Sequence, residues 1–135
     1  MVINIKQDKS KVQGLTEIPM RQLGIISHTF TASGNGDNSQ LKVDYEQIEG
    51  REIYTSGSLK NNGSTTVIVR LASILFDSGY SNISINSGDI VNFKNIRLDI
   101  ISIPAVVGQA TTVNVSFVGI TYNFISAEPE IKWEN

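Results

Sequence analysis

The sequence predicts an all-β protein, an antiparallel two-sheet β-sandwich, and three observations lead to this class. The 135 residues contain 19 Ile and 11 Val against 7 Leu and 5 Ala, and β-branched side chains favour strands over helices. Turn-forming Gly, Asn and Ser recur at short intervals, which fits about seven to nine short strands. Several segments alternate apolar and polar residues, the period of a half-buried strand. We favour a sandwich, with the jelly roll as one form of it, over a closed barrel.

Composition predicts one ordinary globular domain. A chain of this length buries roughly two thirds of its surface on folding, and its 40% hydrophobic and 18% charged residues suit a packed core. The net charge of -2 implies no nucleic-acid partner, and the absence of cysteine excludes disulfides and thiolate ligands within these residues. We find neither a secretory signal at the N-terminus nor an apolar run that would span a bilayer, so we expect no membrane partner.

We divide the chain into three parts. Residues 1–20 form an extended N-terminal arm, residues 21–125 the β-sandwich domain and residues 126–135 a C-terminal tail. Gly14 and Pro19 argue against a helix that would join the arm to the body. The arm carries three lysines between positions 6 and 11 but no aromatic residue, so we interpret it as a salt-bridging segment and not as a nucleic-acid site.

Both ends carry apolar residues that we predict to be interface residues. Val2, Ile3 and Ile5 have the form of an extended segment that adds a strand to a sheet edge and fills pockets with alternate side chains. Ile131 and Trp133 lie among charges near the other end, and Trp is enriched among interface anchors. The alternative, that Trp133 folds back onto its own sheet, stays open at this point.

Within the body we expect a strand over residues 22–31, then an exposed loop over residues 32–39 that contains Gly and Asn residues. The next strand is predicted from Leu41, Val43 and Tyr45, which alternate with charged residues. Residues 64–76 fit either a helix or a strand, and we favour a strand through Leu71 with a helical turn before Gly79.

The apolar pattern changes phase at two places. Around Lys94 and Asn95 the apolar positions move by one residue, which requires either a β-bulge or a tight hairpin turn. In the last long strand, over residues 111–124, the apolar set changes from Val113 and Phe117 to Val118 and later positions. We therefore expect a further slip there, with both faces of that strand partly buried.

The sequence offers no catalytic, cofactor or metal-binding residues that we would select, and we expect a protein that is not an enzyme and needs no cofactor. His28 is the single histidine, and we interpret it as structural, half-buried and hydrogen-bonded, because no nucleophile motif accompanies it. Asp44 and Glu46 share one strand face, which is the ordinary way to keep a sheet soluble. The loop around Asp37 lacks the spacing of a calcium site.

One candidate ligand site is a carbohydrate site built from the loop and an exposed aromatic ring. Its residues are Asn35, Asp37, Asn38 and Tyr54. We select Tyr54 because its strand parity places it with Glu52 and with serine, on a face that we expect to be exposed.

The layout of the chain resembles the small accessory virion proteins of tailed bacteriophages, with Val2-Ile3-Asn4-Ile5 and Glu130-Ile131-Lys132-Trp133 as hooks at its two ends. This resemblance implies a structural component of a capsid, neck, tail or baseplate, synthesised in the host cytoplasm and located in the virion. Its implied partners are copies of itself and other virion proteins, with a host-surface glycan as a further one. The alternative function is a carbohydrate-binding, lectin-like module.

Overall fold

The computed structural model describes residues 2–4, 22–34, 36–43, 54–73, 75–122 and 130–134. The described residues form two antiparallel sheets and a 3-10 turn over Asp37–Ser39. The larger sheet contains β1 (Val2–Asn4), β2 (Gln22–Ala32), β4 (Tyr54–Asn61), β7 (Ile90–Ile96), β9 (Thr112–Tyr122) and β10 (Glu130–Glu134). The smaller sheet contains β3 (Gln40–Lys42), β5 (Val67–Ala72), β6 (Tyr80–Ile85) and β8 (Ile100–Ser102).

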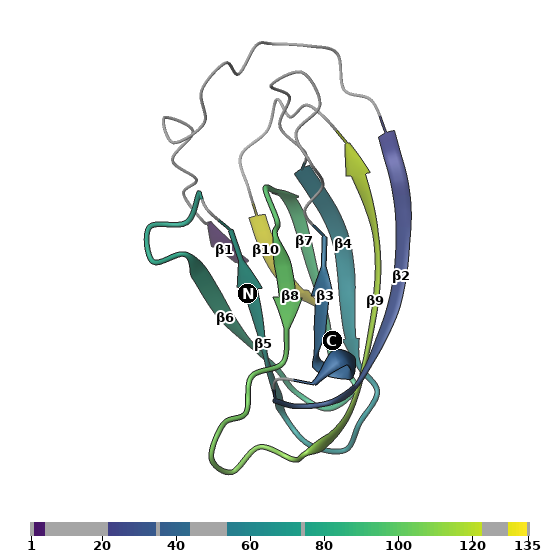
Figure 1. The fold of residues 1–135 in the computed structure, drawn as a ribbon, viewed down its shortest axis with the longest axis vertical. Coiled ribbons are helices and arrows are strands. Elements are labelled where there is room, and N and C mark those ends of the chain that lie inside the picture. The colour runs from purple at the N-terminus through teal and green to yellow at the C-terminus, as the bar shows by residue number, and fades with distance from the viewer. Residues whose placement is uncertain are drawn as a thin grey trace.

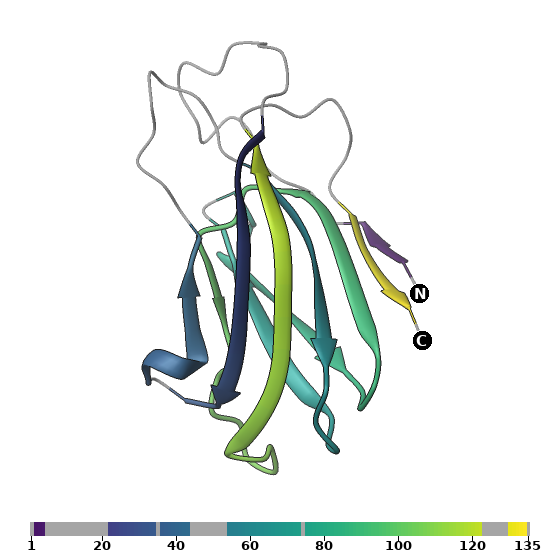
Figure 2. The same ribbon diagram turned by 90° about the vertical axis from the view of Figure 1, so that its right-hand side faces the viewer.

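The strands are wound as a jelly roll. The larger sheet has the order β1-β10-β7-β4-β9-β2 and the smaller sheet the order β3-β8-β5-β6. Four antiparallel pairs are nested in the sequence, namely β5 with β6, β4 with β7, β3 with β8 and β2 with β9. Successive pairs alternate between the two sheets, so the chain is a long hairpin rolled over two layers. Figures 1 and 2 show the layers from two directions, and the predicted sandwich is confirmed.

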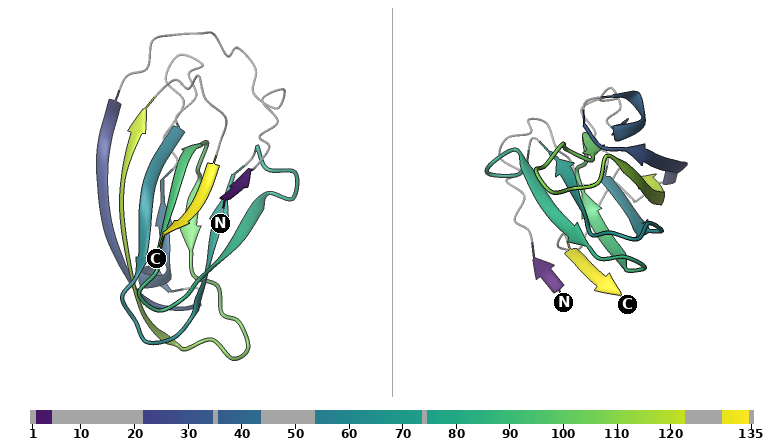
Figure 3. Two further views of the ribbon diagram at one scale, coloured as in Figure 1. Left: turned by 180° about the vertical axis from the view of Figure 1, so that it is seen from behind. Right: turned by 90° about the horizontal axis from the view of Figure 1, so that it is seen from below.

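β10 and β1 extend the larger sheet beyond the jelly roll. β10 pairs with β7 along its whole length, and β1 pairs with β10, with Ile3 opposite Ile131. The two ends of the chain therefore lie side by side at one edge of the larger sheet (Figure 3). Residues 130–134 of the predicted tail belong to the sandwich and are not a separate extension.

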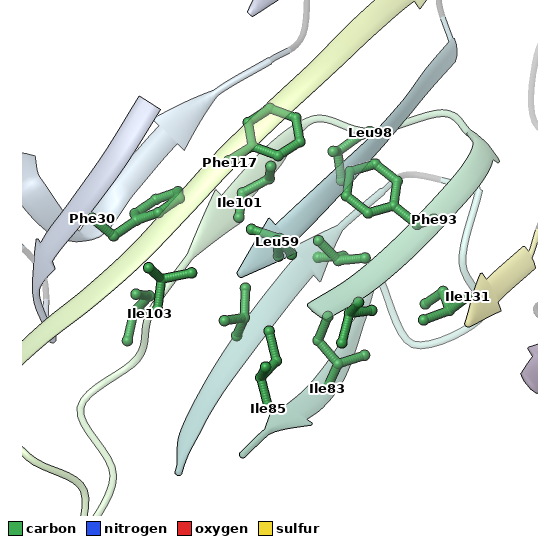
Figure 4. Packing of buried hydrophobic residues seen from close by; sticks show 14 of the residues in the cluster. Phe30, Leu59, Ile83, Ile85, Phe93, Leu98, Ile101, Ile103, Phe117 and Ile131 are labelled. Carbon is green, nitrogen blue, oxygen red and sulfur yellow. The ribbon is translucent and has the colours of Figure 1, made fainter. Parts of the chain in front are cut away.

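The core lies between the sheets and consists of inward side chains from alternate residues. In β5, for example, Val67, Val69 and Leu71 are fully buried. Figure 4 shows how side chains from both sheets interdigitate. The rings of Phe93 and Phe117 stack with their centroids 5.8 Å apart and their planes 8° apart. Close packing of this kind is what gives a sandwich a single core.

Two glycines make room for this aromatic stack. Gly57 and Gly119 lie opposite each other in β4 and β9. A Cβ atom on Gly57 would lie 2.6 Å from Cε1 of Phe117, and a Cβ atom on Gly119 would lie 2.6 Å from its Cζ. Neither position accepts a side chain, because the Phe117 ring fills the space on the inner side of both.

The predicted irregularity at Lys94 and Asn95 is a β-bulge and not a hairpin turn. Between Thr55 and Gly57, β4 has one residue where β7 has two, Lys94 and Asn95. Asn95 adopts a φ of 60°, a conformation that Asn tolerates better than most residues. The bulge returns the strand to its partner with the opposite face inward, which explains the change of phase.

The second predicted slip, in the last long strand, is wrong. Alternation in β9 continues without a break, so that Val113, Val115, Phe117 and Thr121 are buried. Gly119 occupies the inward position between Phe117 and Thr121. Because glycine has no side chain, the sequence does not show that this position faces the core. Val118 and its outward neighbour Ile120 are consequently exposed and not partly buried.

Other predicted elements agree with the structure. β2 covers the strand expected over residues 22–31, and β5 ends one residue beyond Leu71. A turn follows, in which the N–H of Gly79 donates to the carbonyl of Phe76 at 3.0 Å. β3 and the buried Val43 match the start of the predicted alternating strand. The rest of that strand, including Tyr45, lies outside the described residues.

The turns at the lower end of Figure 1 are tied together by hydrogen bonds. We define this lower end by residues 33–34, 62–66, 86–89 and 103–111. Asn61, which is fully buried, donates from Nδ2 to the carbonyls of Thr65 and Ile85 and accepts from the N–H of Gly63. The N–H of Ser33 donates to the carbonyl of Thr111 at 3.0 Å. These bonds give the lower end a defined shape.

Candidate functional site

The predicted interface residues at the two ends of the chain lie together. Val2 and Ile3 belong to β1, whose backbone pairs with β10, whereas Ile5 lies outside the described residues. Ile131 is completely buried in the core of its own chain. The side chain thus fills a position between the two sheets of its own chain, and its predicted role at an interface stays a prediction.

Trp133 folds back onto its own chain, the alternative that the sequence left open. It is half-buried and packs against the core cluster. Its indole N–H donates to the carbonyl of Ser84 at 2.9 Å, which ties β10 of the larger sheet to β6 of the smaller one. A tryptophan near the end of the chain thus closes one side of the sandwich.

The predicted carbohydrate site does not form as expected. Tyr54 is buried and pairs with Tyr122 at the start of β4, so the prediction that it is exposed is wrong. The loop follows the end of β2, at the opposite end of the sheet. Asn38 is exposed there, Asn35 lies outside the described residues, and the side chain of Asp37 is likewise not described. The alternation along the strand correctly places Tyr54 on the outer face of the sheet. The prediction of exposure failed because an outward residue can still be covered, and Tyr54 packs with Tyr122.

His28 is half-buried on the inward face of β2, as the period predicts. Its ring lies edge-on to Phe30, with centroids 4.6 Å apart. Nε2 is buried and has no hydrogen-bond partner in the described part of the chain, so the expected hydrogen bond is not present at this atom. The ring serves as a packing element.

Two long edge strands form a candidate interaction surface. β2 is an edge of the larger sheet over 11 residues, and β6 is an edge of the smaller sheet over six. Neither strand contains Lys, Arg, Asp, Glu or Pro, the residues with which sheets usually protect their edges. The other two edges, β1 and β3, are three residues long. In Figure 1 the two long edges lie on opposite sides of the sandwich.

The outer face of the larger sheet holds a shallow depression of about 520 Å³. Ile25 of β2 lies directly opposite Ile120 of β9, and Val118 is the next outward residue along β9. These three side chains are 72%, 39% and 56% exposed, respectively. Serine and asparagine from β4 and β7 continue the floor, and charged residues of β10 form the far rim. An exposed apolar cluster with a polar rim is typical of an interaction site.

The sequence missed this face for a specific reason. The exposed pair on β9 was assigned to a buried face by the supposed slip. Counting Gly119 as an inward residue would have kept the alternation intact and placed Val118 and Ile120 outside. The signal was therefore present, but a glycine has no side chain to reveal on which face it lies.

The described residues contain no cluster of three or more His, Asp or Glu side chains that could hold a metal ion. The carboxylates Asp44 and Glu46 lie outside the described part, as do the lysines of the arm. Of the helices in the described ranges, none is long and apolar enough to cross a membrane.

Comparison with known proteins supports the fold. A solved structure from Bacillus endospore appendages, described as "a novel family of disulfide-linked pili", has a TM-score of 0.51 to this chain at 20% sequence identity. The similarity covers 78% of this chain and 89% of that chain. At this identity it shows a shared β-sandwich fold and nothing more. No protein-family model matches the chain, and no curated protein matches it in sequence.

Proposed function

We propose that this chain is a structural protein whose copies associate edge to edge into a larger assembly. The observation that carries the proposal is the pair of uncharged edge strands, β2 and β6, on opposite sides of one sandwich. Free N–H and C=O groups at such an edge pair with a strand of another chain. On β6 the Ser84 carbonyl already accepts from the indole of Trp133, so a strand added there must displace the indole or pair beside it. Because the two edges face away from each other, pairing of β2 in one copy with β6 in the next would be head-to-tail, the kind of contact that extends into a fibre when its rotation does not close a ring.

The fold similarity adds support. The similar structure belongs to endospore appendages described as pili, and a fibre is the assembly that repeated edge pairing produces. The resemblance of the chain layout to tailed-phage virion proteins suggests a phage particle as another assembly that such a subunit would build. Disulfide links are not available to these 135 residues, which contain no cysteine, so the proposed contacts are non-covalent.

The N-terminal arm belongs to this proposal. In one chain β1 pairs with β10 through three residues, with Ile3 opposite Ile131. The same register formed with β10 of a neighbouring copy would link two subunits without any new kind of contact, as in domain swapping. The carbohydrate-binding alternative has less support, because buried Tyr54 supplies no platform for a sugar ring.

The proposal is tested with the full chain by sedimentation velocity and electron microscopy over a range of concentrations. We expect large assemblies for the parent protein. Thr29→Lys on β2 and Ser84→Lys on β6 should each reduce assembly, because a lysine at an edge discourages strand addition. The matched control is Thr112→Lys. Thr112 is exposed, but its strand, β9, lies inside the larger sheet and presents no free edge. A parent that stays monomeric, or edge variants that assemble like the control, would contradict the proposal.

The arm is tested separately. Deletion of residues 1–12 should weaken assembly while circular dichroism still shows the β-sheet spectrum of the sandwich. An unchanged size distribution for the deletion variant would show that the arm has no part in assembly.

A further inference from the structure

Five of the large apolar side chains exposed in the described residues gather in two places. Ile25, Val118 and Ile120 form the apolar part of the depression on the larger sheet. Val106 and Val107 form the tip of a loop at the lower end, where Val107 is completely exposed. Figure 2 shows this loop projecting below β9. The described residues thus present a projecting apolar loop and an apolar depression.

Hydrogen bonds hold the loop in a defined shape. The N–H of Gln109 donates to the carbonyl of Val106 at 3.0 Å, and Gly108 has the φ of 86° that this turn needs. The side chain of Gln109 accepts from the N–H of Ile68 at 2.7 Å and donates to the carbonyl of Pro104 at 2.8 Å. A rigid loop that presents valines to water loses little conformational entropy when those valines bind.

Neither surface carries a net charge. The sequence has no charged residue between Asp99 and Glu128, so the loop is neutral along its whole length. The charged residues around the depression are Lys94, Lys132, Glu130 and Glu134, which balance each other. A neutral loop can therefore enter the depression without leaving a net charge buried against it.

We infer that the Val106–Val107 tip of one copy docks into the depression formed by Ile25, Val118 and Ile120 on the next copy. The tip and the depression are two different surfaces of the same molecule, so the contact is head-to-tail and leaves one tip and one depression free for further copies. This inference rests on the proposed function and adds a second contact, independent of the sheet edges.

Cysteine cross-linking tests the contact directly, because the chain has no cysteine of its own. Val107→Cys protein is mixed with Val118→Cys protein, allowed to assemble and then oxidised. We expect disulfide-linked dimers that contain one chain of each variant. Ser64→Cys, in another exposed turn at the lower end, replaces Val107→Cys in the control and should give only background cross-linking. Equal yields from the two mixtures would overturn the inference.

A second variant measures the contribution of the tip. Val107→Asp should raise the concentration needed for assembly by roughly tenfold, the effect of losing one buried valine side chain. Ser64→Asp should leave that concentration unchanged. Assembly of the parent without the Val107 cross-link would overturn the docking inference and leave the edge contacts standing. Absence of any assembly would overturn both, and sedimentation of the parent distinguishes the two cases.

Discussion

The phenol of Tyr122 donates a hydrogen bond to Oδ1 of Asn95 at 2.6 Å and so connects the end of β9 to the bulge in β7. The N–H of Asn95 lies 3.1 Å from the same phenol oxygen and 3.0 Å from Oγ of Ser56. The bulge removes Asn95 from the regular ladder, and this polar cluster supplies its partners. Buried backbone groups that leave a ladder need such partners.

Replacement of Tyr122 by Phe tests the cluster. The variant keeps the ring but removes the hydroxyl, so Oδ1 and the N–H of Asn95 each lose a partner. We expect the free energy of unfolding to fall by about 1–3 kcal/mol, measured by urea denaturation. Unchanged stability would show that water or a rearranged Ser56 replaces the phenol.

The same residue predicts a loss of stability at alkaline pH. Burial raises the pKa of Tyr122 above its ordinary value of 10.0, although hydrogen bonds from Ser56 and from the backbone of Asn95 oppose the rise. The unfolded chain therefore ionises first, and the stabilising effect is complete below pH 10.0 and lost as pH rises toward the folded pKa. Denaturation midpoints should fall less steeply above this pH in Tyr122→Phe than in the parent. Parallel curves would exclude this group as the cause.

The glycines beneath Phe117 should not tolerate a methyl group. We expect Gly57→Ala and Gly119→Ala each to lower the free energy of unfolding by about 1–3 kcal/mol, because the new Cβ overlaps the Phe117 ring. Gly36→Ala is the control, since nothing lies within 4 Å of its Cβ position. Thermal denaturation measures all three, and equal melting temperatures for the three variants would contradict the packing argument.

Ile131 should behave as a core residue of its own chain. We expect Ile131→Ala to cost about 2–4 kcal/mol of stability through the cavity that it leaves. The neighbouring exposed Lys132, changed to Ala, should stay within about 0.5 kcal/mol of the parent. The comparison is made by denaturation at a concentration where the protein is not assembled. A small effect at Ile131 would mean that β10 leaves its place in the isolated chain.

The side chain of Gln109 should replace a strand partner for the backbone of β5. Its Oε1 accepts from the N–H of Ile68, a group on β5 beyond the end of its pairing with β8. We expect Gln109→Ala to lose about 1–2 kcal/mol and to speed amide hydrogen exchange at Ile68. Gln109→Glu keeps the acceptor and loses the bond to Pro104, so it should protect Ile68 better than the alanine variant. Equal exchange rates in parent and Gln109→Ala would contradict this role.

The sequence by itself determined the fold class and most strand positions. Its excess of Ile and Val, its turn residues and its period of two all express local preferences of the backbone, which act before any long-range contact forms. The irregularity at Lys94 and Asn95 could be located for the same reason, because an odd residue shifts every later side chain to the other face. That it is a bulge and not a hairpin turn was decided by the pairing of β4 with β7.

Only the tertiary structure decided which edges stay open, where the termini go and which apolar residues remain outside. Gln22 pairs with Tyr122 at the far end of the chain, and no local pattern carries that partnership. Tyr54 was predicted to be exposed and is buried, because the burial of an alternating residue depends on what packs over it. Ile131, which we predicted at an interface, fills the core of its own chain. Gly119 concealed the phase of β9 because a glycine has no side chain to mark its face. The structure shows that the position is inward, since a Cβ atom there would overlap the Phe117 ring.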